Sequence, residues 1–457
     1  MVTKIPGPRG LPVVGHLPWL VRDSLGFLQK LSREHGDIAA FRVGMTPAVF
    51  ITAPKLIDRI IKDRSFERSH GTRRALASFL KYGLLSLEGQ PHMRHRRLMQ
   101  PAFHRERIKR YGEIMASETY AVLGQWQSQQ PRDLRADMMR LTFAIVTRAL
   151  FNSETKAEAE RVDRALQQIQ PAVMRMGQLA RVLPFEVPML YSAKTQRAIQ
   201  SLHQVVVALV QQRRRENDDR GDLLSMLLTA RDEDGSALSD EDICAEILTM
   251  LFAGHETTAN TMTWAWHLLT QHPKQQEALA AEVRALVGER QLSFDDLPQL
   301  TLADRMVRET MRLYPAAWWA DRISTEAVEL GGYTVPANTL VVFSVYVTQR
   351  DPRYFAAPDT FDPDRFSPER VGQIPDGAYL PFGAGVHMCI GNTFALMEAR
   401  LILSAMAQRF KLGVSPGANE RVRPLPLVTL GMAEPYPVVP VARAAAEVSS
   451  RPRVHDG

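Results

Sequence analysis

The sequence predicts a mainly α-helical fold with a minor β-sheet region, organised as a single large domain. Helix-type patterns dominate residues 55–313, whereas short β-type runs precede and follow them. The 457 residues contain no internal repeat and no low-complexity linker, so we expect one domain over residues 1–457. The last part, about residues 442–457, is polar and is expected to be a disordered tail.

The first elements are extended, and a long helix follows them. Residues 5–18 are rich in proline and glycine and are expected to lie along a surface, while residues 38–43 and 48–52 predict a small antiparallel sheet. Ser239, with Asp242 three residues later, is a helix-start signal, and the next proline is more than thirty residues away. At 1.5 Å per residue this helix would be about 45 Å long. Its middle is almost entirely apolar, so we expect it to cross the core.

Short elements close the chain. Glycines and a proline punctuate residues 328–347 between β-type runs, as in hairpins. A last helix is predicted over residues 392–410, and short strands are predicted within residues 425–441.

Composition narrows the class of protein. Hydrophobic residues make up 45% and charged residues 23% of the chain, which is ordinary for a globular protein. The net charge of +6 is compatible with binding to nucleic acid, to an anionic membrane or to an acidic protein partner, and it does not distinguish among these three. No apolar run is long enough for a transmembrane anchor, and no signal peptide is visible. Cys244 and Cys389 are too few for a disulfide framework, so we expect a reducing, cytoplasmic location.

Cys389 lies in PFGAGVHMCIG, residues 381–391, directly before the predicted last helix. A lone cysteine is most often a small buried hydrophobe. Here glycines let backbone N–H groups approach the sulfur, and the helix N-terminus adds partial positive charge. Both features favour the thiolate, which is the metal-binding form. One thiolate cannot build a four-ligand structural zinc site, but it can be the sole protein ligand of a haem iron.

The cysteine segment resembles the haem-binding loop of cytochromes P450, because Phe382, Gly385, Cys389 and Gly391 fit the pattern F-x-x-G-x-x-x-C-x-G. Four fixed positions in ten residues make the match specific, and the resemblance extends over about residues 5–441. It implies haem b (iron protoporphyrin IX) between the long central helix and the cysteine-loop helix. Cys389 would be the axial ligand of the iron, with Phe382 packed beside the sulfur.

The stretch AGHETT, residues 253–258, gains a role from the same resemblance. Taken alone, its threonines would bond back to the preceding turn, although a glutamate in an apolar helix is costly without a partner. The resemblance places the stretch above the haem and implies that the small Ala253 and Gly254 leave room for dioxygen. Thr257 would hydrogen-bond the dioxygen, and Glu256 would relay protons to it.

Glu309 and Arg312 form a third constellation. An i,i+3 pair of this kind is usually solvated and worth a few tenths of a kcal/mol. This pair lies in a helix predicted to begin at Thr301 with Asp304 as a capping box, and it resembles the E-x-x-R helix of the family. The resemblance implies a buried, structural pair that Arg365 joins.

Two sets of basic residues stand out by position, although each residue taken singly is equally well a surface cation. The resemblance implies that one set holds the two haem propionates through strong, fixed pairs: His92, Arg96, Arg322 and His387. The second set is either a solvated face or the docking site of a ferredoxin or flavodoxin-type electron donor, which works with its own reductase: Arg94, Arg97, Arg105, Arg107, Lys109 and Arg110. No interleaved aromatics or known module accompany these residues, so we expect no nucleic-acid binding.

The resemblance implies a haem-thiolate monooxygenase with separate redox partners. Such an enzyme inserts one atom of dioxygen into a hydrophobic small molecule, here by hydroxylating or epoxidising a lipid, terpenoid or polyketide-like substrate. An apolar pocket is indicated by Trp318, Trp319, Met174 and Met176. One alternative is a thiolate-haem peroxygenase or isomerase, which would not need the proton relay. Another is a non-catalytic haem gas-binding protein, against which the lack of a signalling domain weighs.

Overall fold

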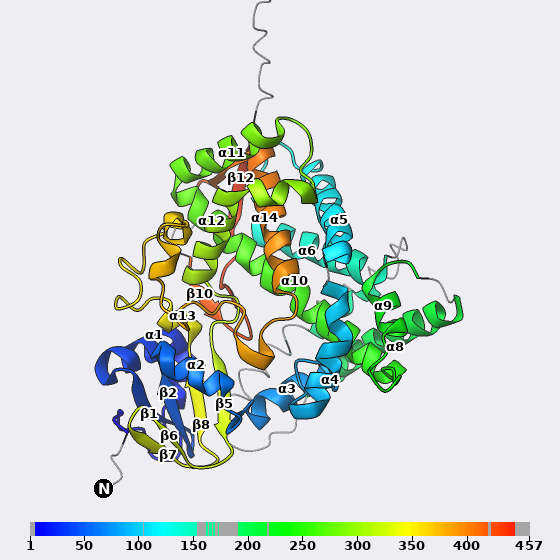
Figure 1. Ribbon diagram of the computed structural model, residues 1–457. Coiled ribbons are helices and arrows are strands. Elements are labelled where there is room, and N and C mark those ends of the chain that lie inside the picture. Colours follow the sequence, from blue (N-terminus) through cyan, green and yellow to red (C-terminus); the bar gives the residue numbers. More distant parts are fainter. Residues whose placement is uncertain are drawn as a thin grey trace, which may run out of the picture.

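The computed structural model confirms the mainly α-helical fold with small β-sheets (Figure 1). It describes residues 5–103, 105–152, 191–216, 219–418 and 422–443, and within the range 161–172 also residues 161, 162, 164–166, 168, 169 and 172. The predicted tail lies outside the described residues from residue 444 onward. A search of the described helices finds none that is long and apolar enough to cross a membrane.

Helices make up most of the described chain, and short strands are interspersed among them. The helices are α1 Leu17–His35, α2 Pro54–Lys62, α3 His70–Leu80, α4 Gly89–Met99, α5 Arg105–Leu123, α6 Leu134–Phe151, α8 Ala193–Glu216, α9 Leu223–Thr229, α10 Asp240–Gln271, α11 Pro273–Val287, α12 Thr301–Leu313, α13 Val345–Thr348 and α14 Asn392–Arg409. The strands are β1 Ile38–Val43, β2 Thr46–Ile51, β3 Phe66–Glu67, β4 Arg132–Asp133, β5 Ala320–Ser324, β6 Val328–Leu330, β7 Tyr333–Val335, β8 Leu340–Phe343, β9 Phe410–Val414, β10 Pro424–Pro426, β11 Leu430–Met432 and β12 Pro437–Ala442.

Helix α10 runs through the middle of the molecule beside α6 and α14 (Figure 1). The Ser239 side chain accepts the backbone N–H of Asp242, and the Asp242 carboxylate accepts that of Ser239. This capping box confirms the predicted start of the helix. Most of its 32 residues are buried, so the expectation that it crosses the core is also confirmed.

Two apolar cores meet on α10. Its C-terminal half, with Met262 and Trp264, packs among α5, α6, α12 and α14. Its N-terminal half, with Ile243 and Leu248, packs among α8, α9 and the end of α3. The helix is therefore held from both sides, which fixes the position of the residues in its middle.

The largest sheet has the strand order β1-β2-β8-β5-β3 and lies at the lower left of Figure 1. β1 and β2 are antiparallel, as predicted, and β8 joins β2 in parallel. The hairpin β6–β7 confirms the turn signals before β8. The predicted β-type run up to residue 347 is wrong beyond residue 343. There Ser344 caps the short helix α13 by accepting the backbone N–H of Val347, which turns the chain away from the sheet.

The last helix and the strands after it confirm the prediction for the end of the chain, with α14 ending one residue before the expected boundary. β10, β11 and β12 fall within or beside the predicted strand region. Strand β9, which follows α14 directly and pairs with β12, was not expected from the sequence.

The predicted capping box of α12 is wrong. Thr301 and Asp304 do not cap each other; instead Glu282 of α11 accepts the backbone N–H groups of Leu302 at 2.7 Å and Ala303 at 3.1 Å. The orphan donors of this helix are thus satisfied by a neighbouring helix, which a local pattern cannot reveal. The helix nevertheless starts at Thr301, as predicted.

Candidate functional site

A cavity of about 490 Å³ is lined by both α10 and the cysteine loop, residues 381–391. Ala253, Gly254 and Thr257 line it from α10, and Cys389 lines it from the loop. Its remaining wall is mostly apolar, with charged side chains confined to a few positions described below. A volume of this size is within the range of small-molecule and cofactor sites.

The cysteine loop has a conformation that its glycines allow. Gly385 has φ +65°, in the left-handed region that favours glycine, and a Cβ there would lie 2.8 Å from Cγ2 of Ile61 on α2. The Cys389 backbone N–H donates to the Phe382 carbonyl at 2.9 Å, which closes the loop. The tight loop therefore requires glycine at position 385 for two independent reasons.

The Cys389 thiol is accessible from the cavity. The protein packed around this cavity wall shields the thiol from bulk water and raises its pKa, while a hydrogen bond from the Gly391 N–H and the charge of Arg96 act in the opposite direction. Arg96 also donates from Nη1 to the Met388 carbonyl at 2.7 Å, which fixes the residue before the cysteine. The other cysteine, Cys244, is buried in α10 away from this cavity, and burial raises its pKa to about 11.

The four basic residues expected at the propionates, His92, Arg96, Arg322 and His387, all line the cavity. His387 contacts His92 between Nδ1 and Nε2 at 3.2 Å, and its Nε2 contacts the Glu88 carboxylate at 2.8 Å. Burial, helped by the charges of neighbouring cations, lowers the pKa of His92 to about 3. His92 is therefore a neutral hydrogen-bonding group at physiological pH.

Arg68 is a fifth basic residue of this group that sequence reasoning missed. It lines the cavity, donates to the Leu85 carbonyl at 2.7 Å, and burial lowers its pKa to about 10. The only sequence signal was a cation directly after a short strand, which is too common to be informative. Around this end of the cavity three guanidinium groups outnumber two carboxylates: Arg68, Arg96 and Arg322 against Glu88 and Asp321.

These features fit a haem. Cys389, a residue type that can hold a haem iron, lines the cavity, and within the described ranges no group of three or more His, Cys, Asp or Glu side chains could hold a metal ion. The excess of guanidinium groups at one end suits a ligand with carboxylates, because Arg–carboxylate pairs are strong and geometrically fixed. The apolar remainder of the cavity suits the macrocycle and a hydrophobic molecule beside it.

The two residues expected to handle protons lie side by side on α10 but face different surroundings. Thr257 lines the cavity, and its hydroxyl donates to the Ala253 carbonyl at 2.8 Å. Glu256 is buried and does not line the cavity; its Oε1 accepts a hydrogen bond from the Thr429 hydroxyl at 2.6 Å. Among the described residues its other oxygen, Oε2, has no hydrogen-bond partner.

Gly254 has a packing reason that the sequence did not indicate. A Cβ at this position would lie 2.8 Å from Cγ2 of Val146 on α6, closer than real carbon contacts. The glycine thus allows α10 to approach α6 closely, whatever room it also leaves in the cavity.

A second buried carboxyl group, Glu398 of α14, was also missed. It is fully buried, and burial raises its pKa to about 8. The Thr258 hydroxyl partly offsets this effect, yet neither carboxyl oxygen has a hydrogen bond of good geometry within the described part of the chain. We therefore expect this side chain to be a neutral acid at pH 7.

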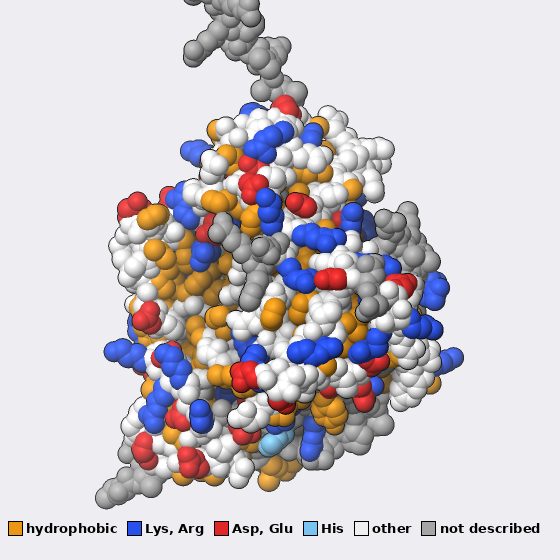
Figure 2. Space-filling view, turned by 45° about the vertical axis from the view of Figure 1, so that its right-hand side comes forward, with side chains coloured by type: hydrophobic (Ala, Val, Ile, Leu, Met, Phe, Trp, Pro, Cys, Tyr) orange, Lys and Arg blue, Asp and Glu red, His pale blue; other side chains and the backbone are white. Residues whose placement is uncertain are grey.

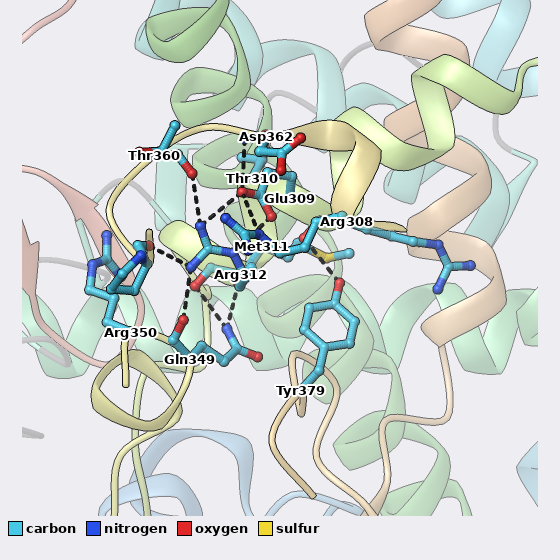
Figure 3. A network of polar contacts seen from close by, with 12 residues as sticks. Arg308, Glu309, Thr310, Met311, Arg312, Gln349, Arg350, Thr360, Asp362 and Tyr379 are labelled. Carbon is cyan, nitrogen blue, oxygen red and sulfur yellow. Dashed lines mark hydrogen bonds and ion pairs between the residues drawn. The ribbon is translucent and has the colours of Figure 1, made fainter. Parts of the chain in front are cut away.

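Glu309 and Arg312 are fully buried and form a two-point ion pair, with Nε donating to Oε2 and Nη2 to Oε1, both at 2.8 Å (Figure 3). Arg312 also donates to the carbonyls of Gln349 at 2.9 Å and Thr360 at 3.1 Å. Arg365 approaches Glu309 at 3.5 Å. None of the three charged residues lines the cavity, so their arrangement is that of a scaffold.

This scaffold extends to the cysteine loop. The Gln349 side chain accepts the backbone N–H of Leu380, directly before the loop, at 3.0 Å. The Tyr379 hydroxyl donates to the Arg308 carbonyl of α12 at 3.1 Å (Figure 3). The chain segment that leads into the loop is therefore tied to the buried ion pair.

The predicted apolar pocket is present in part. Trp319 lines the cavity, whereas Trp318 is buried in the core beside the sheet and donates from Nε1 to the Leu427 carbonyl at 2.9 Å. Met174 and Met176 lie outside the described residues.

The basic set on α4 and α5 is partly neutralised by acids. Arg94 and Arg97 both pair with Asp232, and Lys109 pairs with Asp295 at 3.5 Å. Figure 2 shows Lys and Arg side chains interspersed with acidic ones on the face that these helices occupy. The side chain of Arg105 lies outside the described residues.

Comparisons with known proteins agree with this geometry. The family described as Cytochrome P450 matches residues 5–437. Cyclooctatin synthase from Streptomyces melanosporofaciens is 36% identical over 440 residues, which are 95% of this chain and 95% of that protein. Pentalenene oxygenase from Streptomyces avermitilis is 34% identical over 425 residues, 93% of this chain and 94% of that protein. The crystal structure of the cytochrome P450DA heme domain is similar with a TM-score of 0.88 at 26% identity, over 97% of this chain and 99% of that one.

Proposed function

The chain belongs to the cytochrome P450 family of haem-iron monooxygenases, and from this premise we propose that it inserts one atom of dioxygen into a terpenoid-like substrate. The observation that carries the proposal is the cavity that Cys389 and Thr257 share, with cations at one end and apolar side chains elsewhere. Both bacterial relatives are similar over nearly the whole chain, and one is named for oxygenating pentalenene.

We propose haem b as the cofactor, held by Cys389 as the protein ligand of the iron. The haem, when bound, supplies the iron centre that binds dioxygen and activates it with externally supplied electrons. Coordination deprotonates a thiol outright, which overcomes the effect of burial on the pKa of Cys389. The propionates would pair with the guanidinium groups of Arg68, Arg96 and Arg322, and His92 and His387 would hydrogen-bond them.

We propose that Thr257 and Glu256 deliver protons at the cavity. Thr257 lines the cavity, and its hydroxyl donates to the Ala253 carbonyl of its own helix, from which it would rotate to donate inward. Glu256 is the acid next to it in sequence and is held in a fixed position by the Thr429 hydroxyl. A positioned acid and a hydroxyl are what a proton transfer at neutral pH requires.

The substrate is proposed to be an uncharged hydrophobic molecule. Away from the cationic end, the described lining consists of aliphatic and aromatic side chains with a few threonines, for example Leu76, Leu85, Trp319 and Val428. A carboxylate or phosphate would be desolvated there without a partner, which is costly. A terpenoid loses little on entering such a cavity.

The electron donor is proposed to be a ferredoxin or flavodoxin-type protein that docks over the cysteine loop. Val386 and Met388 of the loop are exposed, and Met93 of α4 is exposed as well. Arg94 and Arg97 lie on the same helix, α4, but both pair with Asp232, so the exposed apolar residues of the loop and of α4 carry this proposal. Both cysteines are free thiols, which fits the cytoplasm that we propose as the location.

Two spectroscopic experiments test this function. The reduced protein with carbon monoxide should show the red-shifted Soret band of thiolate ligation; Cys389→Ala should lose this band, and Cys244→Ala, as the matched control, should keep it. A screen for substrate-induced spectral shifts should then give responses to terpene hydrocarbons and terpenols. Shifts with fatty acids alone would contradict the proposed substrate class, and a Cys389→Ala protein that keeps the band would contradict the ligand.

A further inference from the structure

We propose that Thr429, in the turn between β10 and β11, is a positioning residue for Glu256. Its hydroxyl connects the buried carboxyl group with the cavity, and it sets the position in which this group takes up a proton and passes it on. The inference rests on the proposed monooxygenase function and adds to it a residue that no motif of the sequence contains.

Thr429 is the residue through which Glu256 reaches the cavity in this part of the described structure. Glu256 does not line the cavity, although the adjacent Thr257 does; Thr429 lines the cavity and donates to Glu256 Oε1 at 2.6 Å. Thr429 is itself only 8% exposed, so bulk water does not compete for this bond. The carboxylate therefore meets the cavity through a hydroxyl that is 173 positions away in the sequence.

Asn260 fixes the direction of that hydroxyl. It lies one helical turn after Glu256 on α10, is buried, and donates from Nδ2 to the Thr429 hydroxyl oxygen at 3.1 Å. Since this oxygen accepts a bond from Asn260, its own proton is directed to Glu256. The three side chains thus form an ordered chain of donors, Asn260 to Thr429 to Glu256.

The turn that carries Thr429 is held rigidly against α10. The Trp264 indole N–H donates to the Leu430 carbonyl at 3.1 Å, and the Leu430 backbone N–H donates to the Ala316 carbonyl at 2.9 Å. A Cβ at Gly431 would already be 3.3 Å from Oδ1 of Asn260. On the other side of Thr429, the Trp318 indole N–H donates to the Leu427 carbonyl at 2.9 Å, so the turn is held before and after Thr429 and its hydroxyl cannot easily move with the carboxyl group.

The consequence is a carboxylate with one anchored oxygen and one oxygen without a partner. Oε1 is occupied by Thr429, while Oε2 has no hydrogen-bond partner among the described residues. Among the described residues, Thr429 is thus the side chain that both bonds the Glu256 carboxyl group and lines the cavity, and its bond restrains the rotamer of that group. Loss of this hydroxyl would leave a buried carboxylate free to adopt other rotamers and would weaken proton delivery.

The test compares Thr429→Val with Thr429→Ser in the haem-loaded enzyme. Valine keeps the shape and removes the hydroxyl; serine keeps the hydroxyl. Thr263→Val is the matched control, because Thr263 is a buried hydroxyl on α10 that bonds to Ala259 of its own helix at 2.7 Å and does not line the cavity. Haem content and the carbon monoxide spectrum should stay close to wild type in all three variants.

In Thr429→Val, product formed per NADPH should fall about tenfold, as expected for the loss of a hydrogen bond to a charged group, and the pH profile of product formation should change. Thr429→Ser should recover most of the yield, and Thr263→Val should resemble wild type. An independent readout is the infrared band of the Glu256 carboxyl group, identified by difference against Glu256→Gln in the resting protein. It should shift in Thr429→Val and return in Thr429→Ser.

Three results would overturn the proposal or a part of it. If the Thr429→Val enzyme has wild-type product yield and an unshifted carboxyl band, Thr429 does not position Glu256. If Glu256→Gln loses yield in the same assay, the proposed monooxygenase function still stands. A Thr429→Ser enzyme as impaired as Thr429→Val shows that shape, not the hydroxyl, is required. Wild-type yield in Glu256→Gln itself overturns both the role of Thr429 and the proposed proton route.

Discussion

The substitution Glu309→Gln tests the scaffold behind the cavity. Glu309 is fully buried and its two oxygens accept four hydrogen bonds, from Arg312 Nε and Nη2, Arg365 Nε and the Asp362 backbone N–H. Glutamine keeps the shape, but its amide N–H₂ group would face guanidinium donors, and no negative charge would remain beside the two arginines.

The expected cost is large relative to the stability of the protein. Removing one partner from a buried ion pair costs about 3–5 kcal/mol, because the other charge stays buried without compensation. Native proteins are typically stable by about 5–15 kcal/mol, so the substitution would remove a large fraction of that stability. At 1.4 kcal/mol per factor of ten, the ratio of folded to unfolded protein would fall by about 100-fold to 3,000-fold.

The assay is urea denaturation of the haem-loaded protein, followed in parallel by the Soret band and by far-UV circular dichroism. A matched control is Asp58→Asn on α2. Asp58 also pairs with a cation of its own helix, Lys62, but the side chains of Asp58 and Lys62 are 38% and 66% exposed. That change should cost at most about 0.5 kcal/mol. Since Gln349 and Tyr379 tie this network to the cysteine loop, the Soret band should be lost at lower urea in Glu309→Gln. A midpoint equal to that of Asp58→Asn would refute the reasoning.

Three further outcomes are expected. Thr257→Ala should bind haem, substrate and carbon monoxide normally while product per NADPH falls and hydrogen peroxide rises; unchanged coupling would favour the peroxygenase or isomerase alternative. Glu398→Gln should flatten the pH dependence of Tm. The Glu398 pKa is about 8 in the folded protein and 4.5 in the unfolded chain, so the wild-type protein loses stability as pH rises between these values. A variant whose Tm falls with pH as steeply as that of the wild type would contradict the burial argument. Arg68→Gln should speed haem transfer to apomyoglobin by about tenfold or more, as a charge-assisted bond is worth about 1.5–3 kcal/mol; a wild-type rate would exclude Arg68 from the propionate site.

The parts of the site that follow from the sequence are those in which neighbouring residues act together. The cysteine loop combines glycines, Cys389 and a helix start within eleven positions, and the start of α10 is indicated by Ser239 and Asp242. Such local patterns have a local physical cause, so they can be interpreted without a structure.

The parts that escaped prediction depend on residues brought together by the fold. Thr429 meets Glu256 across 173 positions, and the cap of α12 comes from Glu282 on another helix. Arg68 follows a two-residue strand that carries almost no pattern. Trp318 and Trp319 are adjacent in sequence and their rings stack with centroids 5.4 Å apart, yet only Trp319 lines the cavity, whereas Trp318 is held in the core by its hydrogen bond to the Leu427 carbonyl.

The close approach of α10 and α6 at Gly254 has a practical meaning for protein engineering. Ala253 and Gly254 are neighbours that both line the cavity, and a pocket-narrowing library would treat them alike. They are not equivalent, because a methyl group at position 254 would lie 2.8 Å from Cγ2 of Val146, and α10 and α6 would have to separate to accept it. Substitutions intended to redirect the site of oxidation should therefore be made at position 253. Position 254 can be changed only together with a smaller residue at position 146.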